Sequence, residues 1–189
     1  MVRVKKDKLL CIIKSKLKNT IYLKKLKNIE YKILNQAVKE SSLNVDATRY
    51  EKHLDDYSVG IFQILTKTSE WLGNIDSKED LKDPEICTKY AIKYLDWLYG
   101  RFSEIRDPRE RIKMAFASYN AGRRNVNKAL KRGREFEETS FEGINTEQGA
   151  WSTYDNVVKM FTKYKILSDK NINTNKRYVE FIFNSPYHN

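Results

Sequence analysis

Two Asp-Pro pairs, Asp83-Pro84 and Asp107-Pro108, most constrain how this chain can fold. In each pair the carboxylate can accept hydrogen bonds from N–H groups of the first helical turn, and proline fits the first helical position. Apolar residues with helical spacing follow the first pair as far as Phe102, and Glu110 is placed as in a capping box after the second. The sequence therefore predicts two neighbouring helices, the second ending at about Tyr119.

Further apolar patterns of helical spacing predict that most of the chain is helical. They cover residues 9–17, 33–40, 125–131 and 151–161, with a last short helix around Tyr178, Phe181 and Ile182. Gly133 is expected to end the helix of residues 125–131, and the polar stretch from there to Gly149 is expected to be a mobile loop. Residues 45–65 lack this periodicity and predict at most a small irregular β region. The expected fold class is mainly α.

Length and residue usage favour one domain without metals or disulfides. A chain of 189 residues with 40% hydrophobic residues can bury a core of its own. Cys11 and Cys87 lie on apolar helical stripes and are predicted to be buried thiols. His53 and His188 are the only histidines, so a clustered zinc site is not expected. We predict no metal and no cofactor.

The positive charge is concentrated at the N-terminus. Residues 1–28 contain ten Lys or Arg and one acid, within a total net charge of +11. We interpret them as a basic amphipathic segment that packs on, or leads into, a domain of residues 29–189. Its charge suits an anionic membrane or envelope surface, or simply a solvated face. The apolar run Leu9–Ile13 is too short for a secretion signal, so cytoplasmic synthesis is expected.

Glu40 is the candidate general acid. Its helical pattern is interrupted by Ser41, Ser42 and Asn44, which places the carboxyl at a helix C-terminus. There the partial negative charge of the helix dipole disfavours the carboxylate, and burial beside apolar groups would add to that effect, raising the pKa. A carboxyl that keeps its proton near neutral pH can donate it to the leaving oxygen of a glycosidic bond.

Three short motifs occur in order along the chain. They are Glu40-Ser41-Ser42-Leu43-Asn44, Gly60-Ile61-Phe62-Gln63-Ile64 and Ser118-Tyr119-Asn120-Ala121-Gly122. In sequence and separation they resemble the motifs of the soluble lytic transglycosylase family, whose catalytic domain has a lysozyme-like fold. The segment Lys176-Arg177-Tyr178-Val179 looks like the family's closing motif. The resemblance covers residues 29–182 and implies cleavage of peptidoglycan glycan strands. The short apolar run at the N-terminus suggests a phage endolysin as one setting for this activity.

Residue by residue, the resemblance implies a site around one carboxyl. Glu40 would act as general acid and then as general base, and Tyr178 would donate a hydrogen bond to it. Gln63 and Asn120 would bind sugar, because amides recognise hydroxyl and acetamido groups, and Tyr119 would line the floor. Ser58 is a candidate for the serine that orients the acid, and Glu51 for a further substrate contact. The product would be a 1,6-anhydromuramoyl end.

Two alternatives stay open from the sequence alone. A hydrolytic muramidase would use a second carboxylate, for which Asp46, Glu51, Asp55 and Asp56 are the nearby candidates. A non-enzymatic protein could use residues 1–28 on a membrane or nucleic acid, but that leaves the three motifs unexplained. We expect the protein to be a monomer that binds peptidoglycan and not nucleic acid. We expect it to act at the cell wall, in the lysis of a host cell.

Overall fold

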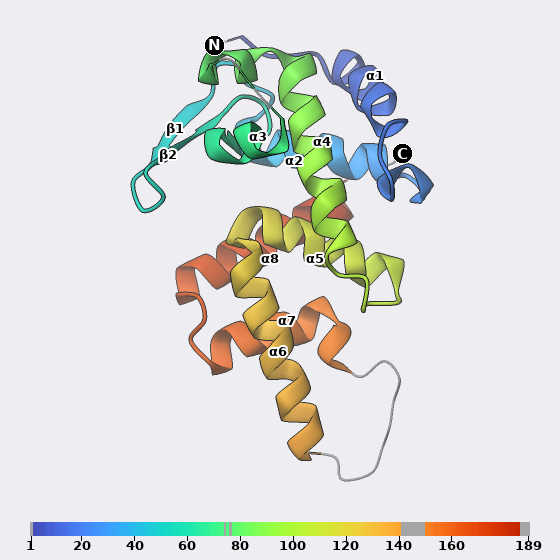
Figure 1. The fold of residues 1–189 in the computed structure, drawn as a ribbon, viewed down its shortest axis with the longest axis vertical. Helices are drawn as coiled ribbons and strands as arrows, with labels where there is room; N and C mark the ends of the chain where they lie inside the picture. Colours follow the sequence, from blue (N-terminus) through green and yellow to red (C-terminus); the bar gives the residue numbers. More distant parts are fainter. Residues whose placement is uncertain (1, 74, 76, 141–149, 186–189) are drawn as a thin grey trace. The chain divides into compact units, whose positions relative to one another are not determined.

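A computed structural model describes residues 2–73, 75, 77–140 and 150–185, which fall into two compact units (Figure 1). The first contains Met1–Trp97 and Phe181–Asn189, and the second Leu98–Glu180. The helices are α1 (Lys6–Leu17), α2 (Ile29–Ser41), α3 (Thr66–Leu72), α4 (Pro84–Gly100), α5 (Pro108–Ala121), α6 (Arg123–Ser140), α7 (Tyr154–Lys163) and α8 (Asp169–Asn184); the strands are β1 (Thr48–Glu51), β2 (Asp56–Val59) and β3 (Ile64–Leu65). The predicted mainly α class with a small sheet is confirmed.

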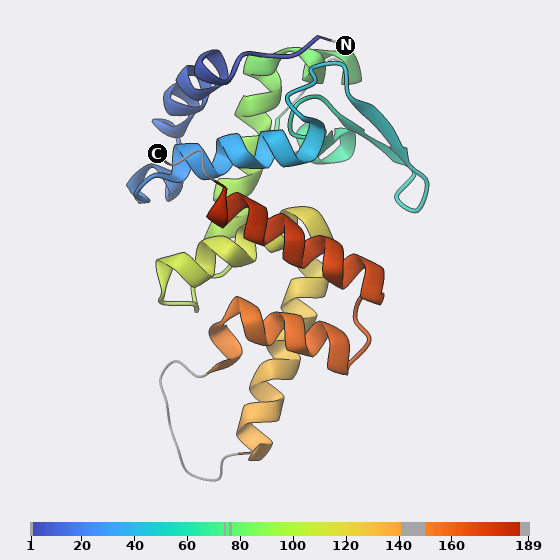
Figure 2. The same ribbon diagram turned by 180° about the vertical axis from the view of Figure 1, so that it is seen from behind.

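Helix α1 packs along α2 in the first unit (Figure 2). Its apolar stripe is buried and consists of Leu9, Ile12, Ile13 and Leu17. The residues before α1 are attached as well, since Val4 N–H donates to the Leu43 carbonyl at 3.1 Å and Val45 N–H to the Val2 carbonyl at 3.0 Å. The predicted amphipathic helix is confirmed, and its apolar face is used inside the fold. The boundary between residues 1–28 and 29–189 stays a prediction.

The carboxylate of Asp96 on α4 fixes the segment between α1 and α2. It is buried and accepts hydrogen bonds at 2.9 Å from the N–H groups of Ile21, Tyr22 and Leu23. These N–H groups lie at the start of a 3-10 turn, Leu23–Lys25, where no backbone acceptor precedes them. One buried acid thus fixes the segment that leads into α2, the helix whose last turn contains Glu40.

The three short strands form an antiparallel sheet in the order β1-β2-β3. Arg49 pairs with Ser58 and Val59 with Ile64, which turns residues 48–65 into a compact meander. The buried carboxylate of Asp56 attaches this sheet to α3, because it accepts the Lys67 N–H at 3.2 Å and the hydroxyl of Thr66. The region predicted to be loop or irregular sheet is therefore a small sheet.

The two cysteines differ in their surroundings. Cys87 is buried on α4, and burial raises the pKa of its thiol to about 12. Cys11 is exposed, so the prediction of a buried thiol there was wrong. The reason is rotational: the buried stripe of α1 passes through Leu9, Ile13 and Leu17, and successive residues are about 100° apart around a helix, which directs position 11 outward.

Helices α5, α6 and α7 pack together in the second unit. The predicted N-cap of α5 is confirmed, because Asp107 Oδ1 accepts a hydrogen bond from the Arg109 N–H at 2.7 Å. Glu110 does not complete a capping box as predicted. Its carboxylate instead accepts the N–H of Tyr154 at 2.8 Å and pairs with Lys113 at 2.6 Å, which fastens the start of α7 to α5.

Helix α6 passes through Gly133, where the sequence predicted a break. A Cβ atom at this position would lie 2.7 Å from Nδ2 of Asn156 and 3.3 Å from Cβ of Trp151. Gly133 therefore lets Trp151 and Asn156 pack closely against α6, and it does not end the helix. The predicted mobile loop is helical from Gly133 to Ser140, while residues 141–149 lie outside the described part of the chain.

Helix α8 is much longer than the short closing helix predicted around Tyr178. It begins at Asp169 and runs for 16 residues. Its first turns contain mainly polar side chains, and Ile172 is the apolar residue among them that is buried. The helical spacing of apolar residues, which predicts a helix, is therefore visible only in the second half of α8.

Candidate active site

Glu40 lies in the last turn of α2 and is half-buried. Ser42 and Leu43 then adopt left-handed backbone angles, with φ of 55° and 65°, and the Ser42 N–H closes the helix on the Val38 carbonyl at 2.9 Å. The predicted position of Glu40 at a helix C-terminus is confirmed. The carboxyl stands at the negative end of the helix dipole.

Ser41, the next residue, connects this helix end to the second motif. Its hydroxyl donates to the Ile61 carbonyl at 2.9 Å. The turn that contains Ile61 is itself fixed, since the Gly60 N–H donates to the Ala47 carbonyl at 2.7 Å and the Gln63 N–H to the Gly60 carbonyl at 3.1 Å. The first two motifs are therefore joined by hydrogen bonds within one unit.

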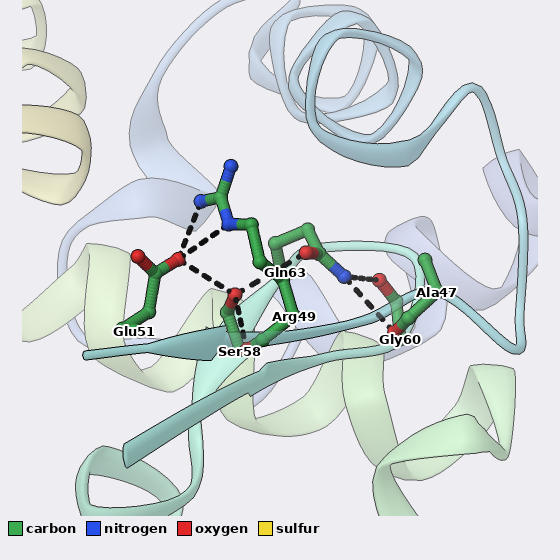
Figure 3. A network of polar contacts seen from close by, with 6 residues as sticks. All are labelled: Ala47, Arg49, Glu51, Ser58, Gly60 and Gln63. Atoms are coloured by element: carbon green, nitrogen blue, oxygen red, sulfur yellow. Dashed lines mark hydrogen bonds and ion pairs between the residues drawn. The ribbon is translucent and has the colours of Figure 1, made fainter. Parts of the chain in front are cut away.

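Gln63 is fixed in the turn by its own side chain (Figure 3). Its Nε2 donates to the carbonyls of Ala47 and Gly60, both at 3.0 Å, and its Oε1 faces the Ser58 hydroxyl at 3.3 Å. An amide has two N–H donors and two acceptor lone pairs. Both donors of Gln63 are used internally, so what it can offer a sugar is an acceptor site on Oε1.

Ser58 is at the centre of the polar network on β1 and β2 (Figure 3). It is 3% exposed, and its hydroxyl lies 3.0 Å from Oε1 of Glu51 and 3.3 Å from Oε1 of Gln63. One hydroxyl proton serves one acceptor at a time, and the shorter distance favours Glu51. The same Glu51 oxygen is 2.6 Å and 2.5 Å from two guanidinium nitrogens of Arg49. Three predicted site residues, Glu51, Ser58 and Gln63, are thus connected.

The other acids near this network have structural partners. Asp55 accepts the Tyr50 hydroxyl at 2.6 Å, and this hydrogen bond raises the pKa of the phenol. Asp56 is the buried attachment of α3, and an oxygen of Asp46 lies 3.4 Å from the Val2 N–H. Among the four acids that could assist a hydrolase, Glu51 is the one that pairs with Ser58, whose hydroxyl lies 3.3 Å from Oε1 of Gln63.

The third motif ends α5 in the second unit. Tyr119 is half-buried and Asn120 is exposed, and Gly122, with a φ of 83°, terminates the helix. Asn120 Oδ1 accepts a hydrogen bond from Nδ2 of Asn175 at 2.9 Å. The predicted sugar-binding amide is therefore oriented by a residue of α8.

Asn175 belongs to a buried group that the sequence did not predict. It is 1% exposed, its Nδ2 also donates to the Ala117 carbonyl at 3.1 Å, and its Oδ1 accepts the Tyr154 hydroxyl at 2.8 Å. Burial raises the pKa of that tyrosine, which stays a neutral donor. The signal that was missed is a polar residue three positions before Tyr178, on the same face of a helix.

Tyr178 is 2% exposed in the middle of α8. It belongs to the second unit and Glu40 to the first. The expected hydrogen bond between them stays a prediction.

Residues 18–141 match the model of the transglycosylase SLT domain, which is more than half of the chain. The chain belongs to this family. No curated protein matches it. The matched range contains all three motifs and ends before Tyr178, whereas the resemblance read from the motifs extended from residue 29 to 182.

As an SLT domain, the chain is a lytic transglycosylase with a mainly α, lysozyme-like fold, an enzyme that cleaves glycosidic bonds in peptidoglycan. The predicted enzyme class is confirmed. Peptidoglycan is its substrate and the cell wall its place of action. None of the described helices has the length and apolar composition needed to cross a bilayer.

Proposed function

We propose that this SLT domain cleaves the β-1,4 bond between N-acetylmuramic acid and N-acetylglucosamine without water, using Glu40 as its single catalytic carboxyl. The observation that supports this most is the placement of Glu40: half-buried, at the negative end of α2, and next to a serine that binds the Gly60–Gln63 turn. A carboxyl in such a place is suited to hold a proton and release it to a leaving oxygen.

The reaction proceeds in two proton transfers through the same side chain. Glu40 first donates its proton to the bridging oxygen as the bond from that oxygen to the muramoyl C1 breaks. The resulting carboxylate then removes the proton from the C6 hydroxyl of the same sugar, and O6 bonds to C1. Glu40 regains its proton, and the product has a 1,6-anhydromuramoyl end.

The remaining site residues would bind and orient the glycan. Gln63 can accept one hydrogen bond from a sugar hydroxyl or N–H group through Oε1. Following the resemblance, we propose that Tyr119 and Asn120 contact sugar. We propose likewise that Tyr178 donates a hydrogen bond to Glu40. We assign Ser58 and Glu51 to the polar network beside Gln63, because the Ser58 hydroxyl lies 3.0 Å from Oε1 of Glu51 and 3.3 Å from Oε1 of Gln63.

The rival proposal is a hydrolytic muramidase with Glu51 as the second carboxylate. What favours it is the position of Glu51 in the network around Gln63. Against it, the oxygen that faces the network already accepts hydrogen bonds from Arg49 and Ser58, which reduces its capacity to take a proton from water. We therefore prefer the reaction that needs one carboxyl.

Masses of the released muropeptides decide between the two reactions. Digestion of purified peptidoglycan is expected to give fragments lighter by one water than the corresponding reducing sugars. The variant Glu51→Gln should give the same anhydro products at a lower rate, because it weakens the network of Arg49 and Ser58 beside Gln63. Reducing ends from the native protein, together with complete loss of activity in Glu51→Gln, would establish the muramidase instead.

We further propose that the lysines of residues 1–28 bring the enzyme to an anionic envelope surface. Because the apolar face of α1 is packed on α2, contact would be made by exposed charges such as Lys24, Lys25 and Lys27, and not by insertion of the helix. Use in host lysis, as by a phage endolysin, stays a prediction; its test is whether cells that produce the enzyme lyse only after their membrane is opened.

Charge reversal tests the envelope proposal better than deletion, since deletion would remove α1 and the backbone pairing of Val2 and Val4. Lys24, Lys25 and Lys27 changed together to Glu should lower lysis of whole cells several-fold, and leave cleavage of purified peptidoglycan unchanged. The matched control reverses three exposed lysines elsewhere, Lys128, Lys159 and Lys170. Equal effects of both triple variants would show that total charge matters, and not this surface.

A further inference from the structure

The buried group around Asn175 determines how the side chain of Asn120 must be oriented. Both N–H groups of Asn175 Nδ2 are used, one by the Ala117 carbonyl at 3.1 Å and one by Asn120 at 2.9 Å. Because a backbone carbonyl can only accept, Nδ2 of Asn175 has to face it, and Oδ1 then faces the Tyr154 hydroxyl at 2.8 Å. The orientation of the Asn175 amide is therefore fixed at three points.

A fixed Asn175 in turn allows one orientation of Asn120. The atom of Asn120 that meets the Asn175 N–H must be an acceptor, so it is Oδ1, and Nδ2 occupies the other branch of the planar amide. Asn120 is exposed, whereas Asn175 is 1% exposed. The exposed amide thus presents N–H donors, and the buried residue is what determines this.

We propose that Asn175 is a positioning residue that makes Asn120 a hydrogen-bond donor toward the glycan. The inference rests on the proposed function, in which Asn120 contacts sugar. The ligand groups it selects are acceptor oxygens, such as the acetamido carbonyl of an N-acetylated sugar. Without Asn175 the amide of Asn120 could rotate and present its oxygen to that carbonyl, where two acceptors would face each other.

The isosteric variant Asn175→Asp reverses the arrangement. A carboxylate still accepts the Tyr154 hydroxyl, but it can donate neither to the Ala117 carbonyl nor to Asn120. Asn120 then turns its own Nδ2 inward and its oxygen outward. We expect KM for glycan fragments to rise about tenfold, with kcat changed less than threefold, because one donor to the substrate is replaced by an acceptor. Asn173→Asp, at an exposed position on the same helix, is the matched control and should leave both constants unchanged.

If the proposal is right, Asn175→Asp raises KM only through Asn120. The same substitution in a protein that lacks the Asn120 amide tests this. In Asn120→Ala protein, adding Asn175→Asp should change KM by less than twofold. A tenfold rise there as well, or an unchanged KM in folded Asn175→Asp protein, would overturn the proposal. Thermal unfolding of each variant establishes which proteins are folded, and Tyr154→Phe, which keeps the bond to the Ala117 carbonyl, should raise KM less than Asn175→Asp does.

NMR of the Asn120 side-chain amide separates this inference from the proposed function, since it needs no substrate. In the native protein its N–H groups should exchange rapidly with water. In Asn175→Asp at neutral pH their exchange should slow, because one of them donates to the buried carboxylate. Rapid exchange in both proteins refutes the positioning role, whereas slow exchange in the variant together with no cleavage of peptidoglycan by the native enzyme refutes the proposed function alone.

Discussion

Replacement of Glu40 by Gln is expected to lower peptidoglycan cleavage by roughly 10²–10⁴-fold, the usual contribution of a positioned general acid and base. Glutamine has the same shape and can keep hydrogen bonds to neighbours, but it cannot release a proton to the leaving oxygen. Because one carboxyl is proposed for both steps, no second group can take over either of them. Release of muropeptides from purified peptidoglycan, measured by mass spectrometry, gives the rate.

The matched control lies at the other end of the same helix. Glu30, in the first turn of α2, should tolerate Glu30→Gln with activity unchanged and a loss in stability of a few tenths of a kcal/mol, since an acid there only complements the helix dipole. Thermal unfolding of Glu40→Gln should match that of the native protein. A folded Glu40→Gln enzyme that retains more than a tenth of the native rate would exclude Glu40 as the acid.

The sequence predicts the position of Glu40 because every signal for it is local. The apolar spacing of Ile33, Leu34 and Ala37 defines a helix, and the polar residues after Glu40 end it. The network of Ser58, Glu51 and Gln63 was predicted only as separate candidates. Their hydrogen bonds depend on the register of β1 and β2, in which Arg49 lies opposite Ser58. The alternation of apolar and polar residues in a four-residue strand does not specify that register.

What the sequence could not predict depends on partners distant in the chain. Gly133 has the sequence signal of a helix end, and only the approach of Trp151 and Asn156 explains why a glycine continues the helix. Asn175 is a polar residue within a polar stretch, and its burial follows from acceptors and donors on α5 and α7. In both cases a contact with residues distant in the chain outweighs the intrinsic preference of the residue for a helix end or for the surface.

Replacement of Gly60 by Ala is expected to cost about 3–5 kcal/mol of unfolding free energy, which combines backbone strain with overpacking. Gly60 has a φ of 75°, where an L residue is strained, and its Cβ would lie 2.1 Å from the Leu81 carbonyl oxygen and 2.8 Å from Sγ of Cys87. One of these atoms belongs to the backbone and the other to a fully buried side chain, so neither can move away cheaply.

Gly122→Ala separates the two contributions. Gly122 has a similar φ of 83°, but the nearest atom to its Cβ would be Nδ2 of Asn125 at 3.9 Å, an ordinary contact. It should cost about 1–2 kcal/mol from strain alone. Urea unfolding of both variants measures the difference, which we expect to exceed about 1 kcal/mol because overpacking adds that much or more. Equal losses would mean that the turn carrying Gln63 is not packed as closely against Leu81 and Cys87 as the structure places it.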